Sequence, residues 1–205
     1  MAVKEFDQFL TAEVVPLLKE LGFRRRRREF VLDGPNGVFA TLGFYPEQYE
    51  PPRFGIQYGV HTPSYVRRKE QQSDHAAEGW PTSSAAPVLA QVFAPDPINP
   101  VMVYQWSIGE PEDRGRVGEQ VRTSITEEIV PTIQRWFDPH VLAEEIRPQT
   151  RPGVFARGAS VPLKALVLID AIPPIEAATL LEGLDDYPRT RDWIEAELQR
   201  TGRLS

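Results

Sequence analysis

The chain has 205 residues, a formal net charge of −6 at pH 7 and 41% hydrophobic residues, which fits one globular domain of ordinary composition. It contains no cysteine, so disulfides, zinc–thiolate sites and thiol nucleophiles are excluded, and its acidic balance disfavours a dedicated nucleic-acid binder. Because no apolar run approaches about 18 residues and the start lacks an apolar leader, we expect a cytoplasmic protein that does not engage a membrane.

The first expected element is an amphipathic helix. Its apolar residues recur at spacings of three and four: Phe6, Leu10, Val14, Leu17 and Leu21. Pro16 interrupts this stripe, and an interior proline removes a backbone hydrogen bond at a cost of about 3 kcal/mol. The helix therefore either kinks there or restarts at Pro16, and Gly22 with Phe23 is typical of its end.

An antiparallel β meander of about four strands is expected next. A first strand ends at residues 30–32, a turn follows at 33–37, and later strands cover 38–45, 53–60 and 101–108. The alternation of apolar and polar residues in these segments is typical of strands with one buried face.

The strand at residues 53–60 alternates most regularly. Its apolar residues run from Phe54 to Val60 at every second position, whereas Gly55 and Gly59 lie on the opposite face. Glycines there indicate that another segment packs closely against that face. Residues 61–100 are expected to form a long irregular loop, functional or mobile, in which a short helix at 87–93 is one option.

The remainder is expected to be helical. A long helix should cover residues 117–137, and its Pro131 stands in a context similar to that of Pro16, which raises the option of an internal duplication. Capping residues and prolines predict further helices, at 139–146, 160–172, 174–184 and 188–202, with a linker or short strand around Val154. The fold class is thus α+β: an α+β domain at 1–146 and a helical extension at 147–205 packed on it.

Part of this pattern is similar to a known family. The residues that carry this similarity are Leu17 to Arg25, then Phe30, then the alternating strand Phe54 to Val60. A helix that ends in Gly-Phe and two basic residues, followed by a meander, resembles the bacterial domain of unknown function 4304 family over residues 6–60. The resemblance implies the fold only, because the family brings no established activity and no site residue.

An arginine run is the first candidate binding site. It consists of Arg24, Arg25, Arg26, Arg27 and Arg28. Cations at a helix C-terminus are favoured by the helix dipole, so a charge-paired surface run is the preferred interpretation, and a site for phosphate, nucleic acid or partner carboxylates is the alternative. Because burying arginines beside Phe30 is expensive, the following strand should start late or contain a bulge.

The second candidate site lies between the sheet and the 61–100 loop. Arg53 and His61 are its binding candidates, and Asp74 and His75 would line it with them. Trp80 is a separate binding candidate, because an aromatic side chain in a loop is typical of an interface. The three histidines are too scattered to predict a metal site. No nucleophile elbow, phosphate loop or dinucleotide motif occurs, so no catalytic residue, metal or cofactor is predicted.

The sequence favours a non-enzymatic protein-binding or interaction module. One version is an immunity or antitoxin-like protein that neutralises a basic toxin, because an acidic surface complements a basic partner. The alternatives are a small-molecule binder or enzyme that uses the 61–100 loop, and nucleic-acid binding through the arginine run. The oligomeric state cannot be predicted from these patterns.

Overall fold

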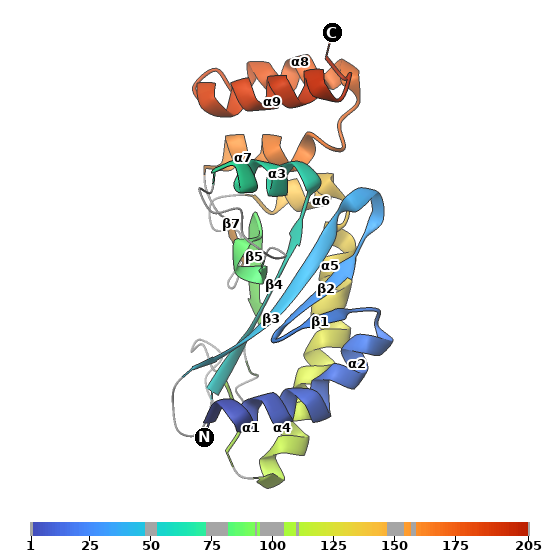
Figure 1. Cartoon of the computed structure of the whole chain (residues 1–205), viewed down its shortest axis with the longest axis vertical. Helices are drawn as coiled ribbons and strands as arrows, with labels where there is room; N and C mark the ends of the chain where they lie inside the picture. The colour runs from blue at the N-terminus through green and yellow to red at the C-terminus, as the bar shows by residue number, and fades with distance from the viewer. Residues whose placement is uncertain are drawn as a thin grey trace.

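The computed structural model describes residues 2–47, 53–72, 82–92, 94, 105–109, 111–146, 154–156 and 159–204. The architecture is α+β, as predicted: the N-terminal and long central helices cover one face of an antiparallel sheet (Figure 1). The C-terminal helices stack beyond one end of the sheet, and the N-terminus lies at the other end (Figure 1). No helix within these ranges is long and apolar enough to cross a membrane.

Seven strands form the described part of the sheet, in the order β1-β2-β3-β4-β5-β7, with β6 paired to β4 beside β5. All neighbours are antiparallel. The strands are β1 (Arg24–Arg26), β2 (Glu29–Asp33), β3 (Phe39–Glu47), β4 (Arg53–His61), β5 (Val88–Val92), β6 (Trp106–Ser107) and β7 (Val154–Ala156). The predicted meander was thus too short, since β1 and β5 were missed and β5 replaces the optional helix at 87–93.

Two long helices and a C-terminal group accompany the sheet. The first comprises α1 (Ala2–Phe9), the π-helical turn η1 (Leu10–Val14) and α2 (Val15–Glu20), and the central one comprises α4 (Pro111–Ser124), the π-helical turn η4 (Ile125–Ile129) and α5 (Val130–Trp136). The others are α3 (Pro63–Gln72), α6 (Pro139–Glu144), α7 (Ser160–Leu168), α8 (Pro174–Glu182) and α9 (Pro188–Arg200). Short 3₁₀ turns lie at η2 (Pro35–Gly37) and η3 (Ser83–Ala85).

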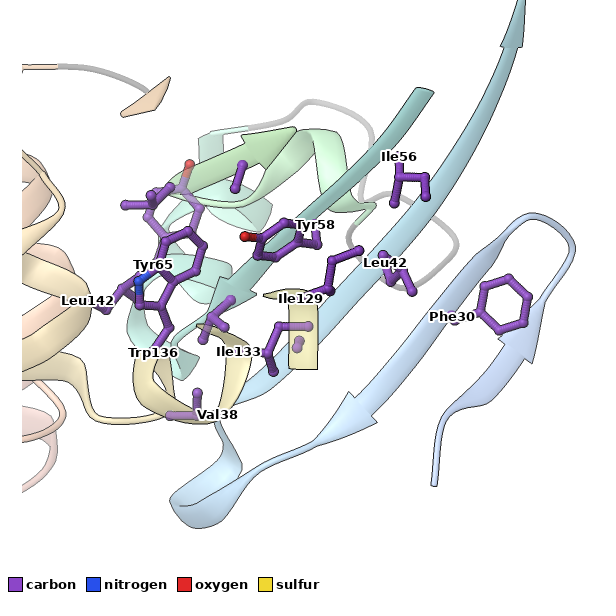
Figure 2. Packing of buried hydrophobic residues seen from close by; sticks show 14 of the residues in the cluster. Phe30, Val38, Leu42, Ile56, Tyr58, Tyr65, Ile129, Ile133, Trp136 and Leu142 are labelled. Atoms are coloured by element: carbon purple, nitrogen blue, oxygen red, sulfur yellow. The ribbon is translucent and has the colours of Figure 1, made fainter. Parts of the chain in front are cut away.

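The core lies between the sheet and the two long helices. Figure 2 shows Ile129, Ile133 and Trp136 of the central helix directed at Leu42 and Tyr58 of the sheet. The Tyr58 and Trp136 rings stack with centroids 5.6 Å apart. All five side chains are at most 3% exposed. The predicted apolar faces of the sheet and of the central helix are therefore the faces that meet.

Both long helices accommodate an interior proline in the same way. A five-residue π turn ends two residues before Pro16, and another ends two residues before Pro131. The wider turn relieves the clash between a proline ring and the carbonyl four residues earlier, which an α-helix could not avoid. Neither helix breaks, so the expected kink or restart is a π turn that leads directly into the next α-helical segment.

The helix α3 lies where the sequence predicted irregular structure. Pro63 is its first residue, and the Asp170 carboxylate accepts hydrogen bonds from the Ser64 backbone N–H (2.8 Å) and from Ser64 Oγ (2.6 Å). The carboxylate thus satisfies a free N–H at the helix N-terminus. The sequence pattern missed this helix because its cap comes from a residue 106 positions away.

The two glycines of β4 have different surroundings. A Cβ atom at Gly59 would lie 2.6 Å from the Val88 carbonyl oxygen and against Ala86, whereas one at Gly55 would meet nothing within 4 Å. Close packing on the outer face is therefore real at Gly59, where the segment that contains η3 crosses the sheet, and the same expectation was wrong at Gly55.

This contrast gives a prediction with an internal control. Gly59→Ala should lower the free energy of unfolding by about 1–3 kcal/mol, because backbone and side chain must shift to admit the new methyl group. Gly55→Ala, on the same face of the same strand, should change it by no more than about 0.5 kcal/mol. Urea denaturation of both variants measures the difference, and equal effects would contradict the packing described.

Candidate functional site

The arginine run folds into a β-hairpin. Arg24 to Arg26 form the edge strand β1, the chain turns at Arg27 and Arg28, and β2 returns from Glu29. Arg27 adopts a left-handed backbone conformation, with φ of 56°. The strand that carries Phe30 thus starts late, at Glu29, as one of the two predicted options had it, whereas the separate strand formed by the run itself, with all three residues exposed, was not predicted.

Most of these arginines have partners within the chain. Arg24 binds the Asp33 carboxylate through two hydrogen bonds of 2.7 and 2.8 Å. Arg28 binds Asp7 of α1 in the same way, at 2.8 and 3.1 Å, and this pairing lowers the pKa of the Asp7 carboxyl. Arg25 donates to the Arg27 carbonyl oxygen at 2.8 Å. Binding of phosphate or a partner by the run stays a prediction, but these contacts give it a structural role first.

A second polar cluster lies on the outer face of the sheet. The Tyr45 hydroxyl donates to the Glu29 carboxylate and lies 2.6 Å from Ser83 Oγ, and the Ser83 backbone N–H donates to Glu29 at 3.2 Å. A Cβ at Gly43 would fall within 2.7 Å of all three side chains. The cluster therefore fastens η3 onto β2 and β3, and only glycine fits beneath it.

Burial is the main influence on the protonation of this cluster. Burial raises the pKa of the Glu29 carboxyl, and burial with the Glu29 hydrogen bond raises the pKa of Tyr45 to about 12. A tyrosine with this pKa stays protonated near neutral pH and cannot accept a proton there, and Ser83 is fully buried. Its chemistry is that of a structural hydrogen-bond network.

The candidates His61 and Arg53 do not form a common site. They occupy opposite ends of β4, which separates them by about 26 Å at a rise of roughly 3.3 Å per residue. His61 is fully buried, its Nε2 lies 2.9 Å from Thr41 Oγ1, and its ring stacks on Phe39. Trp80, Asp74 and His75 fall outside the described residues. The predicted site beside the 61–100 loop is thus not assembled by the two candidates whose positions are known.

An open cleft forms instead between α6, α7 and α8, which the sequence patterns did not reveal. It has a volume of about 410 Å³, and it adjoins a second hollow of about 420 Å³ that shares His140, Lys164 and Leu168. Its lining is mainly apolar: Val161, Ala165, Leu168, Ile172, Leu180 and Leu184. The only sequence signal was that the predicted helices at 160–172 and 174–184 carry more apolar residues than one buried face requires.

A charged network joins α3 to α9 and to the turn that follows α7. Arg67 of α3 reaches Asp170 at 3.4 Å and Glu197 of α9 at 2.7 Å, and Arg200 binds Glu197 at 2.6 Å. Hydrogen bonding from Arg200, with further contributions from both guanidinium groups, lowers the pKa of the Glu197 carboxyl. Among the residues placed in the structure, no three His, Asp or Glu side chains could hold a metal ion.

The buried imidazole predicts an acid-sensitive fold. Burial lowers the pKa of His61 to about 3 from 6.5, so below pH 6.5 the unfolded chain takes up a proton that the folded chain refuses, and stability falls. Between pH 7 and pH 5 this one group should remove about 2 kcal/mol from the free energy of unfolding.

The test compares denaturation of the wild type and of His61→Gln at both pH values. The variant should lose about 2 kcal/mol less than the wild type over this interval. His140→Gln, at an exposed histidine, is the matched control and should keep the wild-type slope. If His61→Gln also keeps that slope, His61 is not the group responsible.

Comparison with known proteins adds no assignment. A scan against protein-family models, a search of curated proteins and a search of solved structures each return no match. The resemblance of residues 6–60 to the domain of unknown function 4304 family therefore stays a prediction, without support from these searches.

Proposed function

We propose that this chain is a protein-binding module, and that the cleft between α6, α7 and α8 receives an apolar segment of its partner. The observation that carries the proposal is where exposed apolar side chains occur. Across the described ranges, the large hydrophobic side chains that remain exposed are Val161 (44%), Ile175 (86%) and Tyr187 (36%). All three belong to the C-terminal helical segment, and Val161 lines the cleft itself.

The position of Ile175 supports the same surface. It lies in the first turn of α8, directly before Glu176 and one turn before Thr179, and both of these residues line the cleft. Exposed apolar side chains next to an apolar hollow are typical of interaction sites, whereas isolated ones are common on any surface. The two features together favour a surface that is covered in a complex.

The lining favours a protein rather than a small metabolite. Small-molecule sites combine an apolar pocket with polar groups that converge inside it. Here the polar lining residues are all at least partly exposed: His140, Lys164, Glu176 and Thr179. The buried lining is apolar, at Ala165, Ile172 and Leu184, which suits the side chains of another protein.

The surrounding network supports a preorganised surface. Asp170, two residues before Ile172, is tied to Ser64 and Arg67 of α3, while Arg67 also holds Glu197 of α9. A wall that is fixed before binding loses less conformational entropy when a partner docks. The immunity or antitoxin-like version is one form of this proposal, with a basic toxin as the partner.

Site-specific photo-crosslinking in the native host tests the proposal. A photoreactive residue placed at Val161 or at Ile175 should give the same crosslinked partner. One placed at exposed Glu20 of α2, remote in sequence from the cleft, should not. Thr179→Trp, which adds bulk at an exposed lining position, should reduce the product at least tenfold while the melting temperature stays within a few degrees of the wild type.

Two results would count against the module. One is a product that forms equally from Glu20, which would indicate random collision. The other is no product from either cleft position in cells where the protein is expressed.

A further inference from the structure

The partner segment that fits the cleft can be described chemically. Resting on the proposed function, we infer that the occupant is an amphipathic α-helix of another protein whose apolar stripe is flanked by lysine or arginine. Three observations carry this: the helical walls of the cleft, the acidic rim along α8, and the net charge of the whole chain.

The shape of the cleft favours a helix. Its walls come from α6, α7 and α8, and an apolar helix face packs into the groove between neighbouring helices as ridges into grooves. The helices α7 and α8 have nine residues each, which is a length of about 13 Å. Over that length a docked helix presents side chains at i, i+3 or i+4, and i+7. Three apolar side chains of the partner can therefore contact the apolar lining of the cleft.

The α8 rim supplies negative charge. Glu176 lines the cleft, Glu182 ends α8, and Asp186 follows shortly after Gly183 and Leu184, which also line it. All three carboxylates are exposed. The opposing cation in the lining is Lys164. Basic residues beside the apolar stripe of the partner would therefore face the α8 rim.

A second copy of the chain is a poor occupant. Each copy carries a net charge of −6, and each brings the same acidic α8 rim, so association of two cleft surfaces juxtaposes like charges. A basic helix meets attraction from both the rim and the whole protein, and this also accelerates its encounter at low salt. Charge therefore selects a different protein as the partner.

Designed peptides test the inference on the full chain. The probe is a fluorescein-labelled 16-residue peptide with leucines at i, i+3, i+7 and i+10, lysines flanking that stripe, and alanine and glutamine elsewhere. One control peptide replaces every lysine with glutamate, and another has the same composition as the probe in a shuffled order that removes the stripe. Fluorescence anisotropy should show the probe binding at least tenfold more tightly than either control.

A matched pair of variants locates the charge effect. Changing Glu176, Glu182 and Asp186 to lysine brings the net charge from −6 to 0, since each change adds two. Changing the exposed residues Glu20, Glu119 and Glu127 to lysine has the same effect on net charge at a distance in sequence from the cleft. The first triple variant should weaken binding of the probe at least tenfold and the second less than threefold.

Each result other than the expected one overturns a stated part of the inference. Tighter binding of the glutamate peptide, or equal losses in both triple variants, overturns the basic partner. A dimer in sedimentation velocity that Thr179→Trp dissociates assigns the cleft to a second copy. If no peptide binds, the helical partner is overturned, and crosslinking from Val161 then decides separately whether the protein-binding function stands.

Discussion

The register between β3 and β4 is the constraint on which most of the molecule depends. Nine Cα pairs join these strands, and they place Leu42 opposite Tyr58 on the face that both long helices cover. A slip of one residue would turn every side chain of a strand to the other face. The same register brings Gly43 and Gly59 to the outer face, where η3 crosses at a distance that no Cβ would allow.

The sequence predicted an element correctly where its apolar residues recur at a regular spacing and its deciding contacts are local. The stripe from Phe6 to Leu21 predicted the first helix, and strict alternation predicted β4, because both patterns reflect one buried face. It failed where a distant group decides the structure. The helix α3 depends on Asp170, and the outer position of η3 depends on Glu29 and Tyr45. These contacts join residues 16 to 106 positions apart, and no local pattern encodes them.

The candidate sites show the same limit. His61 ends a strand and looks available in the sequence, yet it is buried against Phe39 and Thr41. The cleft could not be predicted, because its walls come from three helices that each look like ordinary covering helices. The segments around Pro16 and Pro131 behave differently, because their similarity was visible in the sequence. Both adopt a π turn followed by an α-helical segment. An internal duplication of the two proline segments stays a prediction.

The hairpin of arginines has a consequence for how copies of this protein meet. The strand β1 ends the described sheet at one side, so its outer backbone groups can pair with a strand from another molecule, which is a route to aggregation. Arg24, Arg25 and Arg26 occupy the whole of β1, and a neighbouring copy that paired through its own β1 would bring an identical row of guanidinium groups against them. The run therefore places positive charge along an open edge of the sheet, which disfavours pairing of this edge with the same edge of a second copy.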